Sequence, residues 1–270
     1  MKTAKYGALA VLAAFLLFTA GIPCGAAQEY EPQVGQQGKD VIWVPTHESL
    51  VEAMLDMAGV TPSDYVMDLG SGDGRIVIAA AKRGARAVGF EYNPDMVELS
   101  RKNAEKEGVS DKASFVNADL FTSDFGRATV ITMYLLPQLN LKLRPILLNL
   151  KPGTRIVSHA FDMGDWNPDQ TVEKEGRTAY LWIVPARVGG IWKWQSASGP
   201  SELTLIQTYQ YLSGSLKANG KALEIQDGKL QGDQISFRAG GQEYAGRVNG
   251  ISLEGTVKRN GTRQKWQARK

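Results

Sequence analysis

A glycine-rich loop and three acidic side chains stand where the sequence could bind a ligand that contains a nucleoside. The loop is Gly70-Ser71-Gly72-Asp73-Gly74, and its glycines allow a sharp backbone turn and the close approach of a ligand. Asp68 precedes the loop, where a carboxylate would repel a pyrophosphate but suit an ammonium group. Glu91 could accept hydrogen bonds from two ribose hydroxyls. Asp119 could accept one from the amino group of adenine.

The spacing of the glycines narrows the choice of ligand. It is G-x-G-x-G and not the G-x-G-x-x-G that is typical of dinucleotide sites, which favours S-adenosylmethionine. Each feature also has an ordinary structural interpretation. The glycines could serve only the turn, Asp73 or Asp119 could cap a helix, and Glu91 could be a solvated strand end. The occurrence of all of them in the right order, each after a predicted strand, favours cofactor binding.

The elements that must position these residues alternate between strands and helices. Apolar runs predict strands at 65–69, 85–90, 113–116, 129–134 and 154–159, with a further apolar strand at 180–184. Helices are predicted at 46–58, 76–83, 93–108 and 139–150. This alternation predicts an α/β fold, with a parallel sheet covered by helices on both faces. Such sheets bind ligands beyond the carboxyl ends of their strands, where the three motifs fall.

A longer pattern around these motifs carries a family resemblance. It consists of Asp68–Arg75 and Gly89–Pro94, together with the shorter segments 43–46, 117–120, 134–137, 158–161 and 166–168. On these residues, the stretch 43–186 resembles the class I methyltransferases, which have a Rossmann-like sheet. Within them it is similar to the lysine methyltransferases of the ATP synthase c-subunit type and their archaeal protein-lysine relatives. The resemblance implies S-adenosylmethionine-dependent methylation of protein lysine.

The resemblance also implies roles for individual residues. The glycine loop would hold the methionine moiety, Glu91 the ribose and Asp119 the adenine, and the segment 134–137 would form a wall beside the reactive methyl group. Tyr134 is the expected catalytic residue, beside the incoming nitrogen. The expected cofactor-binding residues are Pro45, Thr46, Asp68, Gly70, Ser71, Gly72, Asp73, Gly74, Glu91, Tyr92, Asn93, Asp119, Leu120, Leu135 and Pro137. Segment 134–137 lacks the Asn/Asp-Pro-Pro-Tyr motif, which argues against planar amino groups of adenine or glutamine as acceptors.

The two histidines and the single cysteine limit the other chemistry. One cysteine excludes a disulfide framework, and so few Cys and His residues argue against a zinc enzyme, so no metal is expected. His159 could act as a base, but a histidine at a strand end more commonly has a structural role. His47 is expected in the first turn of the helix at 46–58.

Residues 1–27 have the order of a secretory signal peptide. Lys2 and Lys5 precede a stretch without charge that ends in Gly25-Ala26-Ala27, and cleavage is expected after Ala27. The stretch is also long enough to span a bilayer, so an uncleaved inner-membrane anchor is the alternative. The expected location is periplasmic or secreted.

The composition changes at residue 187. Residues 28–186 carry 16 Lys/Arg against 22 Asp/Glu, whereas residues 187–270 carry 13 against 6. Pairs such as Asn219-Gly220 and Asn249-Gly250 are typical of tight hairpin turns, and short strand-like runs lie between them. Residues 28–186 are therefore expected to form the methyltransferase domain, and 187–270 an all-β domain, an antiparallel meander or small barrel. Its basic charge could attract a cell-envelope partner, although a solvated outer face with tryptophans in the core is the favoured interpretation.

Two classes of function remain at this stage. The first is a methyltransferase, with protein lysine as the expected substrate and a small molecule as the alternative. The second is an exported binding module that keeps the cofactor fold without turnover. The intact glycine loop, Glu91 and Asp119 favour the enzyme, and no nucleic-acid partner is expected.

The signal peptide leads to a prediction about the N-terminus. Mass spectrometry of the native protein is expected to find an N-terminus at or near Gln28, in the periplasmic or secreted fraction. A full-length chain in the soluble cytoplasm would refute export, and a full-length chain in the membrane would favour the anchor.

Overall fold

The computed structural model describes residues 30–196, 199–259 and 261–270, and the predicted signal peptide at 1–27 lies outside them. Residues 32–270 form one compact unit. In the described part of the chain, no helix has both the length and the apolar character that crossing a membrane requires.

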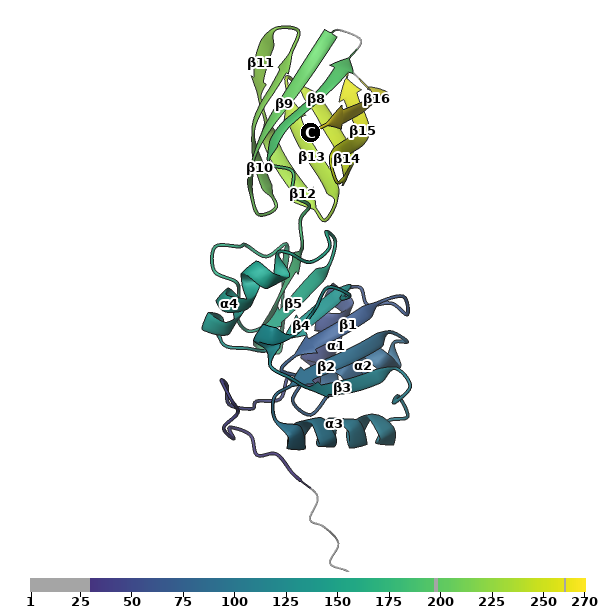
Figure 1. Cartoon of the computed structure of the whole chain (residues 1–270), viewed down its shortest axis with the longest axis vertical. Coiled ribbons are helices and arrows are strands. Elements are labelled where there is room, and N and C mark those ends of the chain that lie inside the picture. The colour runs from purple at the N-terminus through teal and green to yellow at the C-terminus, as the bar shows by residue number, and fades with distance from the viewer. Residues whose placement is uncertain (1–29, 197–198, 260) are drawn as a thin grey trace, which may run out of the picture. The chain divides into compact units, whose positions relative to one another are not determined.

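The first sheet has seven strands in the order β3-β2-β1-β4-β5-β7-β6. Figure 1 labels β1 to β5 of this sheet. Their bounds are β1 Tyr65–Leu69, β2 Arg86–Glu91, β3 Ala113–Asn117, β4 Val130–Met133, β5 Arg155–His159, β6 Gln170–Lys174 and β7 Arg177–Ile183. Strands β1 to β5 run parallel, and β7 pairs antiparallel with both β5 and β6. The predicted parallel sheet is therefore confirmed, and a hairpin of β6 and β7 extends it.

Helices α1 to α4 cover this sheet, and their bounds are α1 Glu48–Met57, α2 Arg75–Lys82, α3 Pro94–Lys106 and α4 Pro137–Leu147. Side chains of α1, α2 and α3 pack with Val66 in one apolar cluster, whereas those of α4 pack with Met67 in a second cluster. Because successive side chains of a strand point to opposite faces, helices cover both faces of the sheet, as predicted.

The connection between β3 and β4 contains a single 3-10 turn, η1 Leu120–Thr122, where many parallel crossovers have an α-helix. The carboxylate of Asp119 caps this turn, accepting a hydrogen bond from the backbone N–H of Phe121 at 2.9 Å. Phe125 and Trp166 fill the second apolar cluster beside α4. The connection therefore begins at the carboxyl edge of the sheet, with Asp119 and the turn η1, and crosses to the amino end of β4 without an α-helix.

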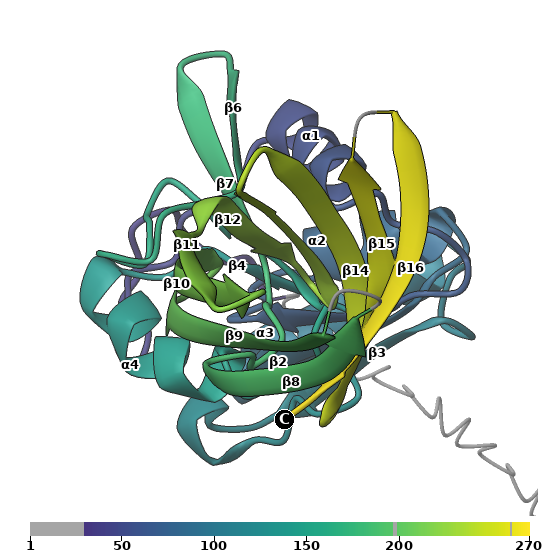
Figure 2. The same ribbon diagram turned by 90° about the horizontal axis from the view of Figure 1, so that it is seen from above.

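Residues from Gly190 onward form an antiparallel barrel. Its strands are β8 Gly190–Ser196, β9 Gly199–Thr208, β10 Tyr211–Ala218, β11 Lys221–Glu224, β12 Gln226–Gln231, β13 Gln234–Ala239, β14 Gln242–Asn249, β15 Ser252–Arg259 and β16 Thr262–Arg269. Strand β9 pairs with both β8 and β10, which closes a ring of eight strands, and β11 pairs with β10 outside that ring. Figure 2 shows these strands curving round. The predicted meander or small barrel is confirmed.

The turn pairs and the tryptophans mostly behave as the sequence predicts. Asn219-Gly220 has positive φ at both residues and joins β10 to β11. Asp227-Gly228, however, lies inside β12, where the pairing with β13 shifts register, so this pair forms a bulge and not a turn. Trp192 and Trp266 are buried in the apolar cluster of the barrel, which confirms their predicted place in its core.

Buried contacts link the segment after β5 to the hairpin between β9 and β10. The indole N–H of Trp166 donates to the side-chain oxygen of Gln210 at 3.0 Å, and the amide of Gln210 donates to the carbonyl of Asn167 at 2.8 Å. Trp166 and Gln210 are both fully buried, and the ring of Tyr209 stacks on Trp166 at 5.8 Å. These contacts cross the predicted boundary between residues 186 and 187, which itself remains a prediction.

The contacts of Gln210 lead to a stability prediction. Gln210→Ala leaves the buried N–H of Trp166 without its partner and removes a part-buried hydrogen bond to Asn167, so it should lower the free energy of unfolding by about 2 kcal/mol. The melting temperature should fall by about 6 °C, as measured by calorimetry. The matched control is Gln267→Ala, which removes an exposed hydrogen bond to Glu254 and should change little. An unchanged melting temperature in Gln210→Ala would contradict the prediction.

Candidate active site

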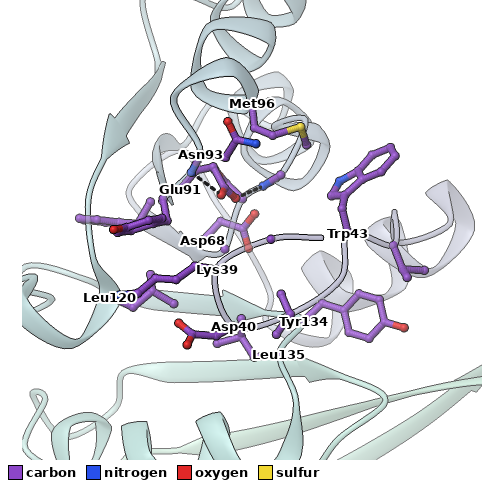
Figure 3. Close-up of a pocket in the computed structure, with 18 of the residues that line it drawn as sticks. Lys39, Asp40, Trp43, Asp68, Glu91, Asn93, Met96, Leu120, Tyr134 and Leu135 are labelled. Carbon is purple, nitrogen blue, oxygen red and sulfur yellow. Dashed lines mark hydrogen bonds between the residues drawn. The ribbon is translucent and has the colours of Figure 1, made fainter. Parts of the chain in front are cut away.

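A cavity of about 310 Å³ opens at the carboxyl ends of the parallel strands (Figure 3). The loops after β1, β2, β3 and β4 form its floor and sides, and residues 36–46, which precede α1, line it as well. The three sequence motifs thus meet at one place, as expected for a parallel sheet.

All but two of the predicted site residues line this cavity: Pro45, Thr46, Asp68, Gly70, Ser71, Gly72, Asp73, Glu91, Tyr92, Asn93, Asp119, Leu120, Tyr134 and Leu135. Gly74 does not line it, because it caps α2 with a positive φ, and a Cβ there would lie 2.7 Å from the ring of Phe115. Pro137, the first residue of α4, does not line it either. For the residues that do line the cavity, the binding roles remain predictions.

The carboxylate of Glu91 holds the glycine loop. One of its oxygens accepts a hydrogen bond from the backbone N–H of Gly72 at 3.0 Å, and the other accepts from the N–H of Asn93 at 2.9 Å (Figure 3). A carboxylate has about four acceptor positions, so each oxygen keeps capacity for a further donor. This arrangement suits a pair of ribose hydroxyls.

Asp68 is a buried carboxyl group with one hydrogen-bond donor among the described side chains. It is 2% exposed, and its Oδ1 accepts a hydrogen bond from the hydroxyl of Thr132 at 2.7 Å. Burial raises the pKa of Asp68 to about 7, against the hydrogen bond from Thr132, and the charges of Glu91 and Asp73 add to the rise. The group is therefore close to half protonated at neutral pH, and a cation brought into the cavity would favour its charged form.

Asp119 lines the cavity and also caps the turn η1. Its position is therefore compatible with both roles considered from the sequence, a ligand of adenine and a helix cap. Its second oxygen accepts a hydrogen bond from the ammonium of Lys39 at 2.6 Å. This bond lowers the pKa of Asp119 and raises the pKa of Lys39. The Lys39 ammonium also lies 4.4 Å from the centre of the Tyr92 ring. Sequence reasoning missed Lys39, because it belongs to no motif and lies 80 residues away from its partner.

Tyr134 lines another part of the cavity and forms an aromatic pair with His159, which does not line it. Their ring centres are 3.8 Å apart, and Nδ1 of His159 lies 3.1 Å from the hydroxyl of Thr46. Burial lowers the pKa of His159 to about 4, and the charge of Arg177 contributes. The imidazole is therefore neutral at physiological pH, which supports its structural role. Phe161, which the sequence reasoning did not single out, also lines the cavity.

The charges of the side chains that line the cavity fit S-adenosylmethionine. Its acidic side chains are Asp40, Asp68, Asp73, Glu91 and Asp119, and its cationic ones are Lys39 and Arg75. Arg75 is paired with Asp73, and Lys39 with Asp119. The remaining carboxylates suit a ligand that carries a sulfonium and an ammonium, and they disfavour a pyrophosphate.

Comparison with known proteins gives the same cofactor. Residues 68–170 match the family described as the ANTKMT methyltransferase domain. A protein-lysine N-methyltransferase of Saccharolobus islandicus is 44% identical over 151 residues, which cover 53% of this chain and 94% of that protein. The ATP synthase c-subunit lysine N-methyltransferase of Mus musculus is 38% identical over 148 residues, which cover 54% of this chain and only 60% of that protein.

A solved structure is similar over the same half of the chain. It is described as an RNA methyltransferase from Salinibacter ruber in complex with S-adenosyl-L-homocysteine. It is 54% identical, with a TM-score of 0.53, and the match covers 54% of this chain and 96% of that one. The predicted fold class and cofactor are confirmed for this half of the chain.

The state of Asp68 leads to a prediction about pH. Binding of the cationic cofactor should lower the pKa of Asp68 from about 7, so that a proton is released on binding. The affinity should then rise by about tenfold between pH 6 and pH 8. Calorimetry in two buffers of unequal ionisation enthalpy measures this release.

Asp68→Asn provides the control for this experiment, because it keeps the shape of the side chain and cannot titrate. The variant should bind S-adenosylmethionine with an affinity that is independent of pH in this range. Equal proton release by the wild type and the variant would show that another group titrates.

Proposed function

Because the chain belongs to the family of S-adenosylmethionine-dependent methyltransferases that includes the protein-lysine N-methyltransferases, we propose that it methylates lysine side chains of proteins. The proposal is supported by the name of the archaeal relative, almost all of whose length this chain covers. The mammalian relative is covered over less than two thirds of its length, so the nature of its substrate gives weaker support.

The observation that carries the proposal is the apolar character of the cavity wall around Tyr134. Its neighbours in the lining are Leu135, Leu136, Leu139 and Phe161. A lysine amine attacks only in its neutral form, and apolar surroundings lower the pKa of an ammonium by removing it from water. This wall would therefore favour the reactive form of the acceptor. A planar amide or base amino group, by contrast, needs paired polar partners, and segment 134–137 supplies none of the expected motif.

The residues of the chain then act mainly by position. S-adenosylmethionine supplies a methyl group that its sulfonium has already activated. The glycine loop, Glu91 and Asp119 would fix the cofactor, and the ring of Tyr134 would orient the incoming nitrogen, with its own position set by His159. Because His159 is neutral and bonded to Thr46, it is a poor general base, and the proton of the ammonium would leave to solvent before transfer.

RNA is a second candidate acceptor, because the similar structure from Salinibacter ruber is described as an RNA methyltransferase. The acidic balance of residues 28–186 disfavours it, since proteins that bind RNA usually present a basic surface. The basic barrel could still recruit an acidic cell-envelope partner of an exported protein. Neither that partner nor the export is needed for the lysine proposal, and both remain predictions.

The acceptor can be identified by incubating the purified mature chain with methyl-labelled S-adenosylmethionine and a cell extract. Label is expected in protein, removable by protease and not by ribonuclease, and amino-acid analysis should find it as N-methyl-lysine. Label in RNA would favour the second candidate. Absence of transfer to any macromolecule would favour a small molecule or a binding module without turnover.

Tyr134 provides the matching variant. Tyr134→Ala removes the ring that packs against His159, so kcat/KM for the protein acceptor should fall by about tenfold or more, while cofactor affinity changes little. Tyr134→Phe keeps the ring and should retain most of the activity. The control is Tyr211→Ala, which lies exposed in the barrel and should leave the kinetics unchanged. Full activity of Tyr134→Ala would contradict the role of Tyr134.

A further inference from the structure

Residues 36–45, here called the strap, cross the cavity just before α1. The strap is a small hairpin, in which the backbone N–H of Trp43 donates to the carbonyl of Gln36 at 2.9 Å and that of Gly38 donates to the carbonyl of Val41 at 2.9 Å. Every residue of the strap lines the cavity. Ile42 and Val44 are more than a third exposed. The strap therefore has no apolar core of its own, and the contacts of a few side chains hold it in place.

Two of these contacts reach the predicted cofactor residues. The indole of Trp43 lies against the glycine loop, since a Cβ on Gly72 would be 2.7 Å from its Nε1. Lys39 donates a hydrogen bond to Asp119 at 2.6 Å, and its ammonium lies over the ring of Tyr92. Lys39 thus ties the strap to the residues that are expected to hold the adenine.

We propose that Lys39 occupies the adenine subsite in place of the cofactor and holds the strap closed until the cofactor displaces it. This inference rests on the proposed function, because it takes Asp119 and Tyr92 as the adenine site. An adenine amino group would donate to Asp119, and the adenine ring would lie against Tyr92. The Lys39 ammonium makes both kinds of contact, through a hydrogen bond and a cation–π interaction.

The ion pair between Lys39 and Asp119 is weak enough for a ligand to displace it. The side chains of Lys39 and Asp119 are 34% and 31% exposed, so water and salt screen their attraction. The closed strap would reduce the fraction of molecules that can accept a cofactor, and the apparent affinity falls by the same factor. Salt that weakens the ion pair should therefore strengthen cofactor binding, which is opposite to the effect expected if Lys39 helped to hold the ligand.

The test measures binding of S-adenosyl-L-homocysteine to the full mature chain by calorimetry, at low and high sodium chloride. Lys39→Met keeps the length of the side chain and removes the ammonium. This variant should bind about fivefold more tightly than the wild type at low salt, and its affinity should not rise with salt. The wild type should approach the affinity of the variant as the salt concentration rises.

Lys82→Met is the matched control, because Lys82 forms an ion pair with Glu107 outside the cavity. It should bind as the wild type does at both salt concentrations. Equal or weaker binding by Lys39→Met would contradict the proposal that Lys39 holds the strap closed, and it would leave the proposed function intact. If the wild type and Lys39→Met both failed to bind S-adenosyl-L-homocysteine, the proposed function would be contradicted. The proposal about Lys39, which rests on it, would then be contradicted as well.

Discussion

The hydrogen bond between Gly72 and Glu91 is the interaction on which the site depends. It ties the loop after β1 to the end of β2, and the pairing of these two parallel strands places both partners at one edge of the sheet. The bond works only because Gly72 adopts a positive φ, which turns its N–H toward the carboxylate. The second oxygen of Glu91 binds Asn93, which caps α3, so one carboxylate orders the loop, the strand end and the next helix.

Much of the first sheet could be predicted from the sequence, because its central strands are buried on both faces and appear as short apolar runs. The edge strand β6 could not, because Gln170, Glu173 and Lys174 are exposed and give no apolar pattern. The hairpin turns were mostly visible as Asn-Gly and Gly-Gly pairs. Asp227-Gly228 shows the limit of that signal, because the same positive φ also suits a bulge.

The candidate site was predictable to a similar extent. The sequence identifies Asp68, Glu91 and Asp119 because each lies at or near the end of a predicted strand. The carboxyl ends of parallel strands meet at one edge of the sheet, so these residues come together without any other information about the fold. The sequence does not identify Lys39 and the strap, because the strap belongs to no predicted helix or strand. Its path over the cavity, and so its contacts, cannot be derived from periodicity or from strand order. The raised pKa of Asp68 also needed the structure, since it follows from burial and from neighbours that are distant in sequence.

The closure of the barrel has a consequence for the speed of folding. Strand β8 pairs with β16, the last strand along the chain, through Lys193 and Arg269. All the other strands of the ring lie between these two in sequence, so the ring closes only after the whole intervening chain has been ordered. Joining segments so far apart has a large entropic cost before any contact repays it, and topologies of this kind fold slowly. Hairpins such as β13–β14 can form early, and closure at β8 and β16 should be the late step that limits the rate.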